Sequence, residues 1–274
     1  MKRHAPMHAP CLADNRNLLN NDNMERNEYI FGIRAVMEAI EAGKEIDKIL
    51  VKKDLQGELA NELFNLVRQY GIVTQRVPVE RINKITRKNH KGVIAILSAV
   101  TYHKMENLVP QLYEDGVLPL VVVLDGITDV RNFGGIARTC ECVGANGIVI
   151  PEHGSVSVNA DAVKTSAGAL HHLPVCRERN IVSAVRFLKD NGYKVVAASE
   201  KSDINYTLTD YTVPVAIVMG AEDTGVSAEV LRLCDTFVSI PMFGHIGSLN
   251  VSVAAGVMLY EAVRQRLAAD MEVI

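Results

Sequence analysis

The chain has 274 residues and a formal net charge of −3; 48% of its residues are hydrophobic and 22% are charged. This length and balance exclude a fibrous or disulfide-stapled chain and are typical of a globular protein with a substantial core. No apolar run approaches the length of a membrane span, and the five cysteines contain no Cys-x-x-Cys pair. We therefore expect reduced thiols in a cytoplasmic protein, with no metal site.

The chain is predicted to begin with a disordered tail and to continue into a small α/β domain. Residues 1–27 are polar and rich in asparagine, a composition that buries too little apolar surface to fold. Residues 28–100 alternate between helical and strand periodicity, which indicates an α/β sandwich. The predicted helices are 33–40, 59–70 and 79–85, and the predicted strands are 48–51, 72–77 and 93–100.

A linker is predicted over residues 101–117, which are mixed in polarity and contain Pro110 and Gly116; a short helix over 104–115 is compatible with this segment. The second domain is predicted over residues 118–269 as a parallel α/β sheet, in which ligand-binding loops lie at the carboxyl ends of the strands. Its predicted strands are 119–124, 147–150, 194–198, 213–219 and 236–240, and its helices are 132–143, 181–191, 227–233 and 248–267.

Three loops at predicted strand ends carry the candidate functional residues. In the first, Asp125–Arg138, Asn132 is either a helix cap or a ligand contact. Arg138 lies further along the same helix, where it is either simply exposed or clamps a phosphate with two hydrogen bonds. The second loop, Val218–Gly225, places Glu222 between two glycines. In the third, Ile240–Gly256, Ser248 can cap the last helix and Asn250 falls in its first turn.

Several common site motifs are absent from the sequence. No G-x-G-x-x-G follows the first strand of the second domain, which disfavours a nicotinamide-dependent dehydrogenase. The chain also lacks the phosphate-binding G-x-x-x-x-G-K-[ST] and the hydrolase motif G-x-S-x-G. His171 and His172 are adjacent, and neighbours in a strand point to opposite faces, so they make a poor metal site.

A basic run extends from Arg76 to Lys91, with six lysines or arginines and one glutamate. Such a run neutralises phosphates or is merely a solvated surface, and the sequence by itself does not choose between these two interpretations.

Together, the three loops resemble the signature motifs of the SpoU (TrmH) family of RNA 2′-O-ribose methyltransferases in order, separation and placement. The resemblance covers roughly residues 119–267, and its most specific part is S-L-N-V-S-V-A-A-G-V-M-L-Y-E-A-V-R-Q-R, from Ser248. The preceding unit resembles the ribosomal-protein-like substrate-binding domain of RlmB-like members, in which a string such as H-K-G-V-I-A-I (His90–Ile96) is typical. One departure is Asp129-Val130, where the family usually has Asp-Pro.

The resemblance implies a SPOUT-type sheet with a trefoil knot, and a homodimer with active sites at the subunit interface. It implies that S-adenosylmethionine is the methyl donor and that the backbone of Gly220, Ile240 and Leu249 holds it. The implied catalytic residues are Arg138, Asn132, Glu222, Ser248 and Asn250. Arg138 would bind the phosphate beside the target ribose, and either act as the base or stabilise the developing alkoxide.

The implied substrate is structured RNA, most specifically a guanosine of 23S ribosomal RNA. The candidate RNA contacts in the first domain are Arg87, Lys88, His90 and Lys91. Two alternatives stay open: a 2′-O-methyltransferase that acts on tRNA, and a non-catalytic RNA-binding or ribosome-assembly factor with the same fold. Full retention of the polar motif residues favours an enzyme.

Overall fold

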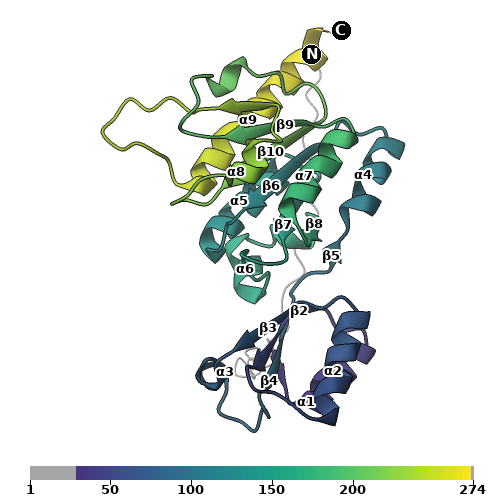
Figure 1. Ribbon diagram of the computed structural model, residues 1–274. Coiled ribbons are helices and arrows are strands. Elements are labelled where there is room, and N and C mark those ends of the chain that lie inside the picture. Colours follow the sequence, from purple (N-terminus) through teal and green to yellow (C-terminus); the bar gives the residue numbers. More distant parts are fainter. Residues whose placement is uncertain (1–28, 273–274) are drawn as a thin grey trace, which may run out of the picture.

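The computed structural model describes residues 29–272, so the tail predicted over 1–27 lies outside the described residues. The described chain contains two β-sheets, each covered by helices, and the two layered units are joined end to end (Figure 1). Within this part of the chain, no helix combines the length and the apolar character that crossing a bilayer would require.

The first unit is a four-stranded mixed sheet in the order β1-β4-β2-β3, with α1 and α2 against one face and α3 against the other (Figure 1). β2 separates the two cores, because Ile49 and Val51 face α1 and α2 whereas Leu50 packs with Ile82 of α3. The elements are β1 (Tyr29–Phe31), α1 (Ile33–Glu41), β2 (Ile46–Lys52), α2 (Glu58–Gln69), β3 (Thr74–Val77), α3 (Val79–Ile85) and β4 (Val93–Leu97).

The second unit is a seven-stranded sheet in the order β11-β9-β10-β6-β7-β8-β5, and every pairing in it is parallel. This confirms the predicted α/β class with a parallel sheet. The strands are β5 (Tyr102–His103), β6 (Leu120–Asp125), β7 (Gly147–Pro151), β8 (Val175–Glu178), β9 (Lys194–Ala198), β10 (Val215–Gly220) and β11 (Thr236–Val238).

Helices cover both faces of this sheet, and β6 shows why the predicted strands are almost continuously apolar. Leu120, Val122 and Leu124 enter the core beneath α5 and α9, whereas Val121 and Val123 enter the core beneath α4 and α7. The helices are α4 (Met105–Glu114), α5 (Val130–Cys142), α6 (Ala160–Thr165), α7 (Ile181–Asp190), α8 (Ala228–Leu231) and α9 (Val251–Glu272), with 3₁₀ turns at Ala169–His171 and Tyr206–Leu208.

The sequence patterns missed four short elements, β1, β5, α6 and β8, because two to six residues carry too little periodicity to register. One of them, β5, lies in the segment that was expected to be a linker, and it pairs with β8 at the edge of the large sheet. α4, which follows it, buries Met105 and Val109 in the second core. The His171–His172 pair lies at a 3₁₀ turn and not in a strand. The knot stays a prediction.

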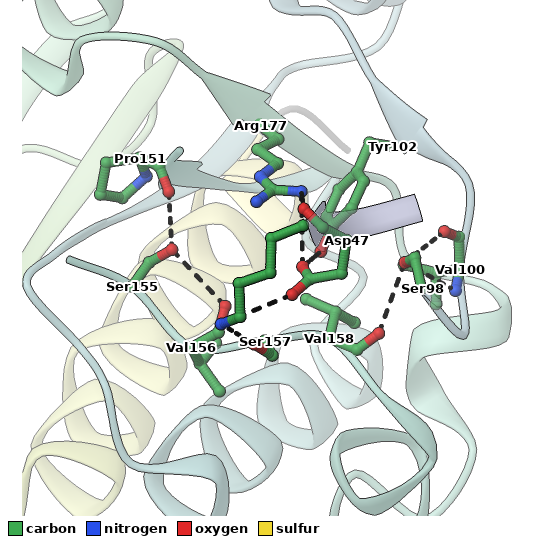
Figure 2. A network of polar contacts seen from close by, with 11 residues as sticks. Asp47, Ser98, Val100, Tyr102, Pro151, Ser155, Val156, Ser157, Val158 and Arg177 are labelled. Atoms are coloured by element: carbon green, nitrogen blue, oxygen red, sulfur yellow. Dashed lines mark hydrogen bonds and ion pairs between the residues drawn. The ribbon is translucent and has the colours of Figure 1, made fainter. Parts of the chain in front are cut away.

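The two units meet through a polar cluster around Asp47 of β2, whose side chain is only 1% exposed (Figure 2). The Tyr102 hydroxyl donates to Asp47 Oδ1 at 2.8 Å. The guanidinium of Arg177 donates to the Asp47 carbonyl at 2.7 Å and lies 3.4 Å from the carboxylate. Burial and the neighbouring carboxylate raise the pKa of Tyr102, so its hydroxyl keeps the proton that it donates.

Further contacts extend the cluster to the loop after β7. The Lys48 ammonium donates to Ser157 Oγ and lies 3.7 Å from the Asp47 carboxylate. The Ala99 amide donates to the Val158 carbonyl at 2.9 Å. We call Asp47, Lys48, Tyr102, Ser157 and Arg177 the interdomain network. It holds the small sheet against the carboxyl ends of β7 and β8.

Removing the carboxylate of the interdomain network should destabilise the protein. We expect Asp47→Ala to lower the free energy of unfolding by about 3 kcal/mol, because it leaves the Arg177 charge poorly compensated at a buried position. The control is Asp54→Ala, which removes a carboxylate that is 81% exposed. It should change the free energy of unfolding by less than about 0.5 kcal/mol. Denaturant unfolding followed by circular dichroism measures both, and equal midpoints would contradict the role of the network.

Candidate active site

A pocket opens at the carboxyl edge of the large sheet, where the loops after β9, β10 and β11 meet. Gly220, Ile240 and Leu249, the three positions expected to hold a cofactor, all line it. Glu222 and Ser248 of the expected catalytic set line it as well. The remaining wall is largely apolar and includes Met219, Val226, Leu231, Val238 and Met242. The second and third of the loops predicted to converge therefore meet at this pocket, whereas no residue of the first loop lines it.

Gly220 ends β10 beneath a tight loop that folds back on it. The Ala221 and Gly225 backbones exchange two hydrogen bonds, of 3.2 and 2.8 Å, and Gly225 has a φ of 70°. A Cβ at Gly220 would overlap the backbone of Gly225 and Val226, so no larger residue fits without moving the loop. Glycine at this position is what allows the loop to present Glu222 at the pocket.

The first and second loops are tied together by Asp125, the last residue of β6. Its carboxylate accepts a hydrogen bond of 2.7 Å from the backbone amide of Ser227. β6 and β10 are paired in register, with Gly220 opposite Asp125. Asp125 therefore fixes the end of the second loop against the first, a function that the sequence patterns did not assign to it.

Asn132 joins residues from all three loops. Its amide nitrogen donates to Glu222 at 3.1 Å, and its amide oxygen accepts from the Asn250 side chain at 2.9 Å. The alternative that Asn132 caps α5 is wrong, because Asp129 accepts from the amides of Arg131 and Asn132. Val130 occupies the first helical position, where proline is also favoured, so the departure from Asp-Pro preserves the helix start.

The last helix begins three residues later than predicted, which changes two assignments. α9 starts at Val251, and the Asn250 side chain accepts from the Ser252 amide at 3.0 Å. Asn250 is therefore the cap, and Ser248 lies before the helix in the wall of the pocket. Asn250 performs two tasks at once, since its oxygen caps α9 while its nitrogen holds Asn132.

Arg138 lies apart from this cluster. It is exposed on α5, six residues beyond Asn132, and within residues 29–272 its side chain has no hydrogen bond or ion pair. It does not line the pocket. Six residues correspond to about 600° of helix rotation, so the two side chains leave α5 in different directions. One chain by itself does not bring Arg138 to the other expected catalytic residues.

The loop after β9 also lines the pocket, through Ser199, Glu200 and Lys201, although no sequence pattern indicated it. β9 was predicted, but its place beside β10 was not. Only the strand order 11-9-10-6 shows that its loop shares the edge with the other three.

The expected RNA contacts lie in the first domain, on the segment between α3 and β4. Arg87, Lys88 and Lys91 are exposed there. His90 is buried, and both ring nitrogens are engaged: Nε2 with Asn83 at 2.8 Å and Nδ1 as acceptor from the Gly92 amide at 2.9 Å. The expectation that His90 contacts RNA is therefore wrong in this conformation, because the ring shapes the turn and has no free nitrogen.

A glycine substitution tests the close approach at the pocket. We expect Gly220→Ala to cost about 1–3 kcal/mol of stability, since the loop must move away from the new methyl group. Gly244→Ala, which meets nothing within 4 Å, is the control. Differential scanning calorimetry compares the two, and a Gly220→Ala melting temperature equal to that of the control would argue against the crowded geometry.

Two family models match separate parts of the chain. Residues 119–260 match the model of the SpoU rRNA methylase family. Residues 29–103 match the model for RNA 2′-O ribose methyltransferase substrate binding.

A curated relative from Staphylococcus saprophyticus, named as a TrmH family tRNA/rRNA methyltransferase, is 38% identical over 86% of this chain and 95% of its own. The SpoU methyltransferase AviRb from Streptomyces viridochromogenes, solved with the cofactor AdoMet, has a TM-score of 0.55 and 27% identity over 91% of this chain and 95% of its own. An AdoMet-bound rRNA methyltransferase from Sinorhizobium meliloti has a TM-score of 0.55 and 27% identity over 88% of each chain. The chain therefore belongs to the SpoU/TrmH family of RNA methyltransferases.

Proposed function

We propose that this protein transfers the methyl group of S-adenosylmethionine to a ribose 2′-hydroxyl of RNA. The observation that carries the proposal is a pocket lined by the second and third loops, to which the first loop is joined through Asn132. Gly220, Ile240 and Leu249 line the pocket, and Asn132 links Glu222 to Asn250. The family membership and the AdoMet complexes of two structural neighbours support the same donor.

The lining of the pocket fits an amphipathic nucleoside with a charged end. Met219, Val238 and Ile240 offer an apolar wall to a flat base, while backbone at the strand ends offers donors and acceptors. Two carboxylates, Glu200 and Glu222, line the pocket together with Lys201, so a cationic sulfonium group finds opposite charge nearby. When bound, S-adenosylmethionine supplies a methyl group on a positively charged sulfur.

The protein then has to position the ribose and assist the loss of its hydroxyl proton. Glu222 and Ser248 line the pocket, and Asn132 connects Glu222 to Asn250, so these four polar residues are proposed to orient ribose hydroxyls. Arg138 holds the neighbouring phosphate and stabilises negative charge on the attacking 2′-oxygen. We favour electrostatic stabilisation over a role as base, because a guanidinium offers five N–H donors and no acceptor.

We further propose that a homodimer completes the site, because Arg138 lies outside the cluster formed by its own chain. α9 carries Val253, Tyr260 and Leu267 at seven-residue intervals, so they share one face, and they are 53%, 56% and 57% exposed. An apolar stripe of this kind on a long helix suits an interface with a second copy. α9 packs directly on α5, the helix of Arg138, so contact through α9 also places the α5 surface near the partner.

We propose ribosomal RNA as the substrate, and a guanosine of 23S ribosomal RNA as its most specific form. The family model for SpoU rRNA methylases and the rRNA methyltransferase from Sinorhizobium meliloti support this choice. The relative from Staphylococcus saprophyticus is named for both tRNA and rRNA, so tRNA is the alternative. Arg87, Lys88 and Lys91 are the proposed first-domain contacts, and a cytoplasmic location follows from such a substrate.

Replacing Arg138 should separate donor binding from methyl transfer. We expect Arg138→Ala to lower the rate of transfer by at least about a hundredfold, since it removes charge stabilisation of the alkoxide. Calorimetry should show nearly unchanged S-adenosylmethionine affinity. Arg186→Ala on α7, which removes an exposed arginine elsewhere, is the control for charge.

The assay follows tritiated methyl transfer from S-adenosylmethionine into total RNA, with separation of ribosomal RNA from tRNA. Near-normal transfer by Arg138→Ala would remove Arg138 from the mechanism. No transfer by the unaltered protein into either RNA would favour the alternative of a non-catalytic RNA-binding factor.

The proposed dimer predicts that a charge in the α9 stripe produces monomers. Tyr260→Glu should dissociate the dimer, because an unpaired carboxylate would be buried at the interface. The control is Tyr70→Glu in the first domain, since Tyr70 is 51% exposed and Tyr260 is 56% exposed. This variant should leave the dimer intact. Light scattering after size exclusion measures the mass, and a Tyr260→Glu dimer would rule out this face.

A further inference from the structure

A second cleft, distinct from the pocket of the active site, lies between the two domains. One wall is α2 with β3, and the other is formed by the residues that follow β7 and β8. Three arginines and one histidine line it, against a single carboxylate, Glu152. The arginines are Arg68, Arg76 and Arg179, and the histidine is His153. The side-chain amides of Asn61 and Asn65 lie on the same wall as Arg68.

The arginines differ in how far they are already engaged. Arg76 is fixed, since it donates to the Lys53 carbonyl at 2.9 Å and its guanidinium lies 5.0 Å from the centre of the Phe64 ring. Arg68 and Arg179 are exposed, and neither side chain has a hydrogen bond or ion pair with any residue in the described part of the chain. Their hydrogen-bonding capacity is directed to whatever enters the cleft.

The two walls are held in place by the interdomain network. Arg177, which donates to the Asp47 carbonyl, lies two residues before Arg179 on the segment that forms the second wall (Figure 2). Lys48 and Ser157 join the first domain to the loop that carries Glu152 and His153. These contacts constrain the backbone on both sides of the cleft, while the exposed side chains of Arg68 and Arg179 can adjust to a ligand.

The cleft also shares an edge with the active site. β7 is the neighbour of β6, and β8 is the neighbour of β7, in a sheet whose strands all point the same way. His153 follows β7, which lies about 5 Å from β6, and Arg179 follows β8, which lies about 10 Å from β6. The loop that contains Asn132 follows β6 at the same edge of the sheet.

The basic segment predicted from the sequence lies further away. Val93, which follows it, pairs with Val51 at the far end of β2, whereas Asp47 of the interdomain network is near the start of that strand. Four residues of strand span about 13 Å. Arg87, Lys88 and Lys91 therefore lie near the far end of β2. The cleft extends from that end, where Arg76 pairs with the same Val51, to the residues that follow β7 and β8.

We propose that this cleft binds the phosphodiester backbone of the substrate RNA and directs it from the first domain into the active site. The inference rests on the proposed function and extends it. Guanidinium groups bind phosphate oxygens with two parallel hydrogen bonds, and side-chain amides contact the sugar–phosphate backbone, so this lining suits a nucleic acid strand. The excess of positive charge on rigid walls favours a polyanion.

The test compares two double variants of the full-length protein. Arg68→Ala with Arg179→Ala removes one free guanidinium from each wall. The control variant, Arg34→Ala with Arg186→Ala, removes two exposed arginines outside the cleft. Arg34 suits this purpose because the acidic residues around it repel phosphate; they are Glu38, Glu41, Glu58 and Glu62. The probe is purified, fluorescein-labelled, fragmented ribosomal RNA, whose binding is followed by anisotropy across a salt series. Calorimetry with S-adenosylmethionine checks that the methyl-donor pocket is unaffected.

We expect the cleft variant to bind the RNA roughly tenfold more weakly, with a salt slope shallower by about 1.5, because two phosphate contacts are lost. The control variant should retain the slope of the unaltered protein. An unchanged slope in the cleft variant would overturn the inference and leave the proposed function standing, whereas no RNA binding by the unaltered protein would overturn both. An equal loss of binding to poly-glutamate would show a general anion site and overturn the assignment to RNA.

Discussion

The parallel pairing of β6 with β10 is the constraint on which the active site depends. With Gly220 opposite Asp125, the loops that follow the two strands leave the sheet side by side. The hydrogen bond from the Ser227 amide to Asp125 then fixes one loop against the other, and Asn132 reaches Glu222. A shift of one residue in this pairing would turn alternate side chains of β10 to the opposite core and separate these groups.

The site is built from groups that serve the fold and the chemistry together. Asn250 caps α9 and also holds Asn132, so the position of the last helix and the orientation of a candidate catalytic amide are coupled. At its other end α9 is fastened by Arg266, whose guanidinium donates to the carbonyls of Tyr211, Leu118, Pro119 and Val213. A helix held at both ends gives the third loop a fixed endpoint.

The interdomain network extends this order from one sheet to the other. Apolar packing of the same volume is often as stabilising as a buried ion pair, but the contacts of Asp47 with Tyr102 and Arg177 are directional and link the two sheets. Here it sets the small sheet against the ends of β7 and β8, beside the edge that carries the active site. The proposed path of the RNA, from the basic segment through the cleft to the pocket, requires that the two domains keep this arrangement.

Much of the fold could be predicted because its longer elements repeat with a clear period. The helix over 79–85 and the strand over 194–198 have the predicted bounds, and the loops with Gly220, Glu222 and Asn250 stand out by composition. Elements of two to six residues, such as β5 and α6, escaped because a period needs several repeats to be visible. Because β5 was not predicted, the segment before Pro119 looked like a linker, although β5 extends the large sheet.

The sequence by itself determined the α/β class, the family and the polar residues of the three loops, because these depend on local periodicity and on residues close together in the chain. Tertiary structure decided which strands are neighbours, and hence that Ser199–Lys201 border the pocket, that His90 is buried, and that Arg138 stands apart from Asn132. The order of the strands follows from contacts between residues far apart in sequence, which no local pattern encodes. Burial of His90 depends on closer neighbours, because its ring nitrogens contact Asn83 and Gly92, but these contacts belong to an irregular turn that has no periodic signature in the sequence.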